Sequence, residues 1–336
     1  MAGDLILLTG ATGMIGFKTL TLLLQEGYVV RAAVRNQAGF DRISSLGPVA
    51  KFKAQLSSVI VPEITVPGAY DEAVRGVKYI VHAASPLPGS TQGADYQATL
   101  IQPAVEGTVG ILKSAAKTTG IERVVITASV SSIVSNERVR SGVMFDENTL
   151  DTDTKGPLND EVYAYFASKA LAHAAVKDFM QTAKPSFNVI NVLPAYVVGR
   201  DETVTDASAI AKGSNGLVMG PLLGYPRDYP IGGRTVHLDD GAKMHVLSLE
   251  PKVEGNQDFL AAAEGIEWAD SFEIVKRRYP KAYAEGVFKF ESISKPVTTT
   301  ANVDAGKATR VLGVEFKGFE EQVVSVVDHF LELAAQ

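Results

Sequence analysis

The stretch Leu5-Ile-Leu-Leu-Thr-Gly-Ala-Thr-Gly-Met-Ile-Gly16 decides the fold of this chain. Its first four residues are apolar, which predicts a buried strand, and a glycine-rich turn follows at once. After the turn, Leu20, Leu23 and Leu24 recur at helical spacing, so the turn opens a helix. A strand, a G-x-x-G-x-x-G turn and a helix in this order are typical of the first unit of a doubly wound α/β fold.

The three glycines of this turn each have a physical reason. Gly10 permits the tight turn, Gly13 lets the main chain approach a pyrophosphate, and Gly16 allows close packing of helix on sheet. The free N–H groups and the positive end of the helix dipole then attract phosphate. A turn that serves packing alone is the alternative, and the position between a strand and a helix argues against it. The predicted phosphate-binding residues are Gly10, Thr12, Gly13, Met14, Ile15 and Gly16.

Short apolar runs alternate with amphipathic stretches along most of the chain. Alternation of this kind predicts a Rossmann-type, doubly wound parallel sheet covered by helices on both faces. We expect a dinucleotide-binding domain of residues 1–195 plus about 235–265, and a smaller, interleaved C-terminal cap of about 196–234 plus 266–336. The predicted strands are 5–8, 29–34, 59–61, 79–82, 124–127, 189–192 and 258–261, and the predicted helices are 14–26, 68–75, 95–118, 160–183, 240–249, 268–279, 303–312 and 319–334.

Composition excludes several classes of function. The 336 residues contain no cysteine, so there is no disulfide framework, thiolate nucleophile or Cys-based metal site. The 32 basic and 38 acidic residues form no charged run, which argues against nucleic-acid binding. The five histidines lack metal-ligand spacing, and no metal is expected. No targeting or membrane-spanning stretch is visible, so we expect a cytoplasmic protein without a membrane partner.

The residue after the second predicted strand indicates which dinucleotide binds. Sites that prefer NAD place an Asp or Glu there to bind the ribose 2′-hydroxyl, whereas this chain has Arg35. A guanidinium suits a 2′-phosphate through its charge and its fork of donors. We therefore expect NADP(H), with Arg31 or Arg42 as further candidates to assist. A solvated surface role for Arg35 is the alternative.

Two more stretches of the sequence contain residues that can exchange a proton or a hydrogen bond with a carbonyl oxygen. Tyr165 and Lys169 stand four residues apart on one helix face, and a fixed ammonium lowers the pKa of a nearby phenol. The pair can therefore exchange a proton with a carbonyl or alcohol oxygen. Ser129 ends an apolar strand at the edge where functional groups of such sheets lie, and it can donate a hydrogen bond to a carbonyl. Ser131 and Ser132 are rivals for this role.

The glycine turn, the Ser129 strand end and Tyr165-x-x-x-Lys169 together resemble the extended short-chain dehydrogenase/reductase family over nearly the whole chain. Val30-Arg-Ala-Ala-Val-Arg35, Gly68-Ala-Tyr-Asp-Glu72, Val81-His-Ala-Ala-Ser-Pro86 and Val192-Leu-Pro-Ala-Tyr-Val-Val-Gly199 are similar to its dihydroflavonol-reductase-like branch, which includes NADPH-dependent aldehyde and ketone reductases.

The resemblance implies a role for each matching residue. Ser129, Tyr165 and Lys169 match the catalytic triad, in which Tyr165 protonates the carbonyl oxygen and Lys169 also binds the nicotinamide ribose. The resemblance places the rest of the cofactor on Glu63, Ile64, Ala83, Ala84, Ser85, Thr127, Pro194 and Val197. Some reductases of this branch carry a second basic residue shortly after the Arg35 position, where this chain has Gly39.

The expected substrate pocket is formed by Leu87, Val130, Val134, Tyr196 and the loops of 200–235. These residues are mostly apolar, which favours a small, neutral, hydrophobic or aromatic carbonyl compound. The leading hypothesis is an NADPH-dependent carbonyl reductase that acts as a monomer or homodimer. An NAD-dependent sugar-nucleotide epimerase or dehydratase of the same fold and a non-catalytic NADP-binding sensor are the alternatives.

Overall fold

The computed structural model describes residues 2–86, 95–150, 152, 154 and 160–336. Its contacts divide the chain into two compact units. Unit 1 consists of Met1–Ser135, Glu147–Leu193 and Ala242–Phe259, and unit 2 consists of Asn136–Asp146, Pro194–Gly241 and Leu260–Gln336. The domain boundaries expected from the sequence stay a prediction. They differ from these units by leaving 136–146, 194–195, 235–241 and 260–265 with the first domain.

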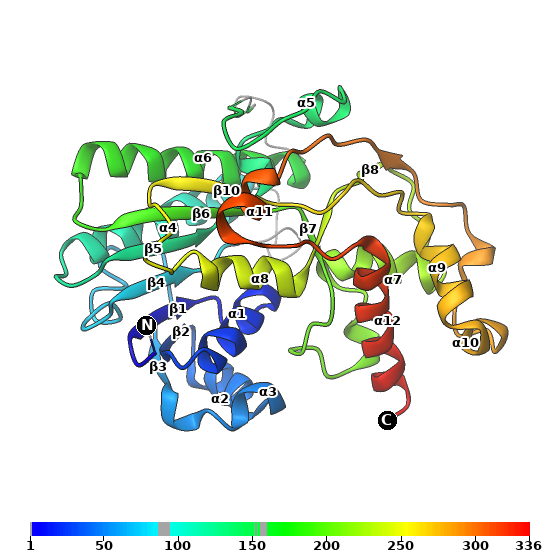
Figure 1. Cartoon of the computed structure of the whole chain (residues 1–336), viewed down its shortest axis with the longest axis horizontal. Helices are drawn as coiled ribbons and strands as arrows, with labels where there is room; N and C mark the ends of the chain where they lie inside the picture. The colour runs from blue at the N-terminus through cyan, green and yellow to red at the C-terminus, as the bar shows by residue number, and fades with distance from the viewer. Residues whose placement is uncertain (1, 87–94, 151, 153, 155–159) are drawn as a thin grey trace. The chain divides into compact units, whose positions relative to one another are not determined.

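A seven-stranded sheet is the basis of unit 1, with the strand order β10-β6-β5-β4-β1-β2-β3 (Figure 1). The strand β1 pairs in parallel with both β2 and β4, and β2–β3, β4–β5 and β5–β6 are also parallel pairs. This topology confirms the predicted doubly wound α/β sheet. The strands are β1 Leu5–Thr9, β2 Val29–Val34, β3 Leu56–Ile60, β4 Tyr79–His82, β5 Arg123–Thr127, β6 Asn188–Pro194 and β10 Gln257–Ala261.

Helices follow the strands as the alternating pattern predicts. Those that begin in unit 1 are α1 Met14–Gln25, α2 Gln37–Ser45, α3 Gly47–Ala50, α4 Gln102–Ala116 and α6 Glu161–Ala183, and α8 Leu238–Leu247 runs from unit 2 into unit 1. A one-turn 3₁₀ helix, η3 Val130–Ser132, follows β5 directly.

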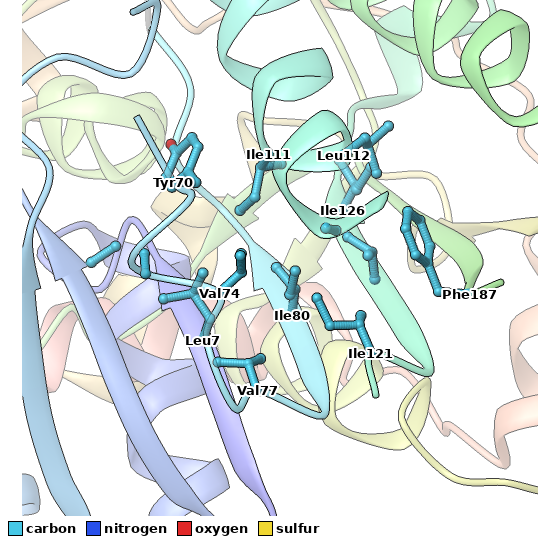
Figure 2. Close-up of a cluster of buried hydrophobic side chains, with 14 of the residues drawn as sticks. Leu7, Tyr70, Val74, Val77, Ile80, Ile111, Leu112, Ile121, Ile126 and Phe187 are labelled. Atoms are coloured by element: carbon cyan, nitrogen blue, oxygen red, sulfur yellow. The ribbon is translucent and has the colours of Figure 1, made fainter. Parts of the chain in front are cut away.

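One hydrophobic core of unit 1 lies between the sheet and helices α4 and α6. Leu7 and Ile80 from neighbouring strands are fully buried against Ile111 and Leu112 of α4, as Figure 2 shows. Burial of a side chain of this size stabilises the fold by about 1.5–3 kcal/mol. These apolar contacts fix the sheet and α6, from whose residues the candidate site is built.

The helix expected over residues 68–75 is absent, and that prediction is wrong. The segment forms consecutive turns, in which the N–H of Asp71 donates to Gly68 and that of Arg75 to Glu72. Gly68 has a φ of +79°, outside the right-handed helical region. The Asp71 carboxylate accepts a hydrogen bond from Ser114 at 2.6 Å, which connects this segment to α4.

Unit 2 has a second core and two small sheets. Strands β7 Tyr196–Val198 and β9 Thr235–His237 form one sheet, and β8 Ile231–Gly232 and β11 Thr298–Thr299 form the other. Trp268, Phe272 and Val326 are central to its core. Its remaining helices are α5 Asn136–Arg140, α7 Gly216–Leu222, α9 Asp270–Arg278, α10 Pro280–Ala284, α11 Gly306–Leu312 and α12 Phe319–Ala334. Among the described residues, no helix has the length and apolar character needed to cross a membrane.

Candidate active site

The glycine turn is fixed by close main-chain contacts that leave no room for larger residues. Gly10 has a φ of +73°, and a Cβ there would lie 2.7 Å from the main chain of Ala83 and Ala84. A Cβ on Gly16 would lie 2.0 Å from the carbonyl oxygen of Gly10. These two positions therefore require glycine, because any side chain would displace the main chain of the turn.

The start of α1 has the properties of a phosphate-binding helix. Gly13 is its N-cap and provides no capping side chain, and its first turn contains no acidic residue. The nearest atom to a Cβ on Gly13 would be 3.6 Å away, so the outer side of the turn is open. Uncapped N–H groups at a helix start, without a competing carboxylate, fit the pyrophosphate of a dinucleotide.

The three arginines near β2 make different contacts. Arg35 is exposed directly after β2, and its positive charge helps to hold the pKa of Glu63 below its ordinary value, after the larger effect of hydrogen bonds from Thr65. Arg42 donates to the carbonyl of Thr12 at 2.9 Å and so lies beside the glycine turn. Arg31 is bound to main-chain carbonyls of residues 73 and 75, which leaves Arg35 and Arg42 as candidates for a 2′-phosphate.

The carboxyl ends of the neighbouring strands β1 and β4 are joined by hydrogen bonds of the buried Thr9. Thr9 Oγ1 lies 2.8 Å from His82 Nδ1 and accepts the main-chain N–H of Ala84 at 3.1 Å. Ile64, on the adenine side of the expected site, packs on Gly107 of α4. The Thr9–His82 contact thus fixes the path of Ala83, Ala84 and Ser85, the three residues expected to line the cofactor.

His82 is held neutral by its surroundings. Burial, and then the positive charge of Lys169, lower its pKa from 6.5 to about 3. Its ring packs edge-on against Tyr70, with centroids 6.1 Å apart. His82 therefore serves as an uncharged hydrogen-bonding group at every pH near neutrality.

The burial of His82 in its neutral form predicts that the folded protein loses stability in acid. Between pH 6.5 and 3 the unfolded chain binds a proton on His82 that the folded chain excludes, so the free energy of unfolding falls as pH falls. The expected loss is about 2 kcal/mol between pH 6.5 and pH 5. Urea unfolding at pH 7 and pH 5 measures it, with His82→Gln as the comparison. The difference between the two pH values should shrink in the variant, and an equal difference in both proteins contradicts this account.

Lys169 is a buried ammonium with one described partner. It is 6% exposed, and its Nζ donates to Ser85 Oγ at 2.7 Å. Nζ also lies 5.6 Å from the ring centroid of Tyr165, one helical turn earlier on α6. Burial lowers the pKa of Lys169 from 10.5 to about 8, so it is still mainly charged at pH 7. An ammonium has three donors, and the two that Ser85 does not use suit ribose hydroxyls.

Ser129 is arranged as a hydrogen-bond donor. Its Oγ accepts the N–H of Ser131 at 3.2 Å and the hydroxyl of Ser131 at 2.8 Å. Its own N–H donates to Ser132 Oγ at 3.1 Å, which completes the capping of η3. Because the oxygen of Ser129 already accepts twice, its proton is left to donate elsewhere. The structure also brings η3 into contact with α6, the helix of Tyr165 and Lys169.

Two buried polar contacts of this region were not predicted from the sequence. Thr127, the last residue of β5, lies 2.7 Å through Oγ1 from Nε2 of the fully buried His245. His173 on α6 bonds to Asp258 at 2.9 Å, and Asn191 donates to the same carboxylate at 2.7 Å. These contacts join α6 to β6 and β10. The sequence contained only two signals for these contacts. His173 lies one turn after Lys169, and Asp258 lies in a predicted strand.

The remaining predicted site residues lie in several places. Pro194, Tyr196 and Val197 belong to unit 2, where the carbonyl of Val197 accepts the Ser214 hydroxyl. Val130 is half-buried in η3, and Val134 is buried at 1% exposure. Leu87 lies outside the described residues. No group of His, Asp and Glu able to hold a metal ion is found in the part of the chain that the structure describes.

Comparison with known proteins identifies the family. The model of the NAD dependent epimerase/dehydratase family matches residues 6–261. The chain belongs to this family. Its members include the extended short-chain dehydrogenases/reductases, as the glycine turn and the Tyr165–Lys169 pair indicated. A site for a nicotinamide dinucleotide is therefore expected, and the uncapped α1 terminus and the buried Lys169 fit such a group.

Individual family members are similar over the full length of the chain. Ketoreductase CTB6 of Cercospora nicotianae is 34% identical, and the match covers 99% of this chain and 96% of the relative. Dihydroflavonol 4-reductase of Gerbera hybrida is 26% identical, over 96% of this chain and 85% of the relative. Yeast methylglyoxal/isovaleraldehyde reductase Gre2, solved in complex with NADPH, has the same fold, with a TM-score of 0.86 at 23% identity over 98% of this chain and 99% of that one.

Proposed function

We propose that this chain reduces a ketone or aldehyde to an alcohol with NADPH. The observation that carries the proposal is the buried Lys169 ammonium, held by Ser85 and set beside the ring of Tyr165. A protein that only binds a dinucleotide has no need of this pair together with Ser129. The full-length similarity to proteins named ketoreductases supports the same conclusion.

The proposed reaction assigns one task to each side chain. When bound, the reduced nicotinamide supplies the hydride. Tyr165 donates its phenolic proton to the carbonyl oxygen, and Ser129 donates a hydrogen bond to the same oxygen. The Lys169 charge favours the phenolate that Tyr165 becomes, and Lys169 also binds the ribose hydroxyls of the cofactor. Thr9 and His82 keep Ser85 in place and so fix Lys169.

A carbonyl panel tests this function. Wild-type protein is incubated with NADPH or NADH and a series of aromatic and aliphatic ketones and aldehydes, and the decrease in absorbance at 340 nm is followed. We expect turnover with NADPH and at least one aromatic carbonyl compound. Turnover of a nucleotide sugar alone indicates the epimerase or dehydratase alternative, and cofactor binding without any turnover indicates the sensor.

The preference for NADPH is expected to depend on Arg35. Removing its guanidinium in Arg35→Ala deletes charge-assisted bonds to the 2′-phosphate, so the KM for NADPH should rise about 10-fold or more, while the KM for NADH stays near its wild-type value. Arg75→Ala is the matched control, because Arg75 is an exposed arginine of the same unit that pairs only at the surface with Glu72. An unchanged ratio of the two KM values in Arg35→Ala would show that another residue selects the cofactor.

A further inference from the structure

Four polar residues follow one another at intervals of four along α6. They are Tyr165, Lys169, His173 and Lys177, and residues at this spacing lie one above another on a helix. Lys169 and His173 are 6% and 4% exposed, so the series continues into the interior one turn beyond the candidate catalytic pair. Buried polar side chains need hydrogen-bonding partners, and His173 and Lys177 find theirs on the sheet.

The buried carboxylate of Asp258 on β10 is this partner. It lies 2.9 Å from His173 Nε2 and 3.1 Å from Lys177 Nζ, and it accepts a hydrogen bond from Asn191 on the neighbouring strand β6 at 2.7 Å. Burial raises the pKa of Asp258, but the bonds and charges of these three residues outweigh burial and lower the pKa to about 2. Asp258 is therefore ionised near neutral pH and only accepts, so His173 Nε2 is the donor.

The two halves of α6 are held against unit 1 in different ways. In the second half, Val176, Phe179 and Met180 join the apolar core of unit 1. Up to Val176, the buried residues of this helix are only alanines, one serine, Lys169 and His173. A buried methyl group stabilises by roughly 0.8 kcal/mol and does not interdigitate as Leu or Ile does. Directional hydrogen bonds are therefore needed to fix the rotation of the first half, which carries the candidate catalytic pair.

Two polar contacts determine where Lys169 lies. Its own Nζ donates to Ser85 Oγ at 2.7 Å, and one turn further along α6 the bond from His173 ties the helix to Asp258. Lys169 Nζ lies 5.6 Å from the ring centroid of Tyr165, so a small rotation of the helix changes the distance between charge and phenol. Misplacing a reacting group by about 1 Å can lower a rate by about 100-fold, which makes the second contact important for the reaction.

We propose that Asp258, acting through His173, is a positioning residue that holds Lys169 beside Tyr165. The proposal rests on the proposed function and adds to it two residues that are assigned no contact with substrate or cofactor. Because Asp258 stays ionised near neutrality, the link persists over the pH range in which a reductase works. A link that serves stability alone is the alternative, and it predicts an unchanged Tyr165–Lys169 pair in every variant that folds.

A titration of Tyr165 in His173→Leu tests the proposal without any turnover. The substitution removes the donor to Asp258 and keeps a side chain of similar size. The pH at which Tyr165 ionises is read from the ultraviolet absorbance of its phenolate, as the difference between each protein and the same protein carrying Tyr165→Phe. A displaced Lys169 ammonium favours the phenolate less, so this midpoint should rise by about 0.5 pH unit or more in His173→Leu.

Two further variants separate positioning from stability. His173→Gln should restore the midpoint, because its amide nitrogen can donate to Asp258 from nearly the same place. Ser114→Ala is the matched control, since it breaks another hydrogen bond between a buried side chain of unit 1 and a carboxylate, that of Asp71. Urea unfolding should show a loss of stability in Ser114→Ala and in His173→Leu, whereas the midpoint should move only in His173→Leu.

Turnover supplies the second measurement. With NADPH and an aromatic ketone, kcat should fall about 10- to 100-fold in His173→Leu and recover in His173→Gln, while the KM for the ketone changes less. If His173→Leu does not fold, His173→Ala takes its place. A wild-type midpoint in the folded variant, or an equal shift in Ser114→Ala, overturns the inference. A shifted midpoint in a protein that reduces no carbonyl compound overturns the proposed function alone.

Discussion

Tyr165→Phe is expected to abolish most carbonyl reduction while leaving the protein folded. The substitution removes one hydroxyl and almost no volume, so the packing of α6 is preserved. Loss of a positioned general acid typically lowers a rate by roughly 100- to 10,000-fold, about 3–5 kcal/mol of transition-state stabilisation. Affinity for NADPH should remain close to wild type, because the residues proposed to contact the phosphates and the adenine are those of the glycine turn, Arg35 and Glu63.

Two neighbours on the same helix sharpen this test. Lys169→Ala should lower kcat and also weaken NADPH binding, since we propose that its ammonium both favours the phenolate and binds the ribose. Tyr163→Phe, two residues from Tyr165, should change the chemical step little. The three variants are compared by kcat and by NADPH titration. A wild-type kcat in Tyr165→Phe, or a large loss confined to Tyr163→Phe, would remove Tyr165 from the mechanism.

Gly16→Ala should disrupt both the fold and the cofactor site. The added Cβ would lie 2.0 Å from the Gly10 carbonyl oxygen, and this contact is with main chain that cannot rotate away. Overpacking of this kind costs about 1–3 kcal/mol or more, and the shifted turn no longer presents its N–H groups to phosphate. Urea unfolding should show a stability loss of at least about 2 kcal/mol, and NADPH binding should weaken more than 10-fold.

Two other glycines serve as controls for that experiment. Gly47→Ala places its Cβ where no atom lies within 4 Å, so stability should stay equal or rise slightly. Gly13→Ala has no neighbour closer than 3.6 Å and should fold normally, yet its methyl group faces the expected pyrophosphate and should weaken NADPH binding. Equal stabilities for Gly16→Ala and Gly47→Ala would contradict the packing account of the turn.

Regular patterns of apolar residues made the sheet predictable from the sequence. The apolar runs at 29–34 and 79–82 coincide with β2 and β4, and the helix expected over 160–183 agrees with α6 to within one residue. These elements are buried on both faces or amphipathic over several turns, so the local pattern and the tertiary environment agree. The positions of the glycine turn before α1 and of Tyr165 and Lys169 on α6 were predictable for the same reason, while their roles stay a prediction.

Contacts between segments distant in sequence were not predictable. The 68–75 segment has a helix-like pattern, yet it forms turns, with Gly68 at a φ of +79° and Asp71 bonded to Ser114 of α4. Ser131 could be named only as a rival of Ser129, whereas the structure shows its hydroxyl bonded to the oxygen of Ser129. The pairing of Thr9 with His82 spans 73 residues and leaves no local sequence signal.

The central claim is that this chain transfers hydride from NADPH to a carbonyl carbon while Tyr165 supplies the proton. NADPH deuterated at the transferred C4 position tests it most directly, with an aromatic ketone as the carbonyl substrate. Mass spectrometry of the product alcohol should show one deuterium at the carbinol carbon with wild-type protein, and this labelled product should nearly vanish with Tyr165→Phe. An unlabelled alcohol, no alcohol at all, or equal labelled product from Tyr165→Phe would contradict the account.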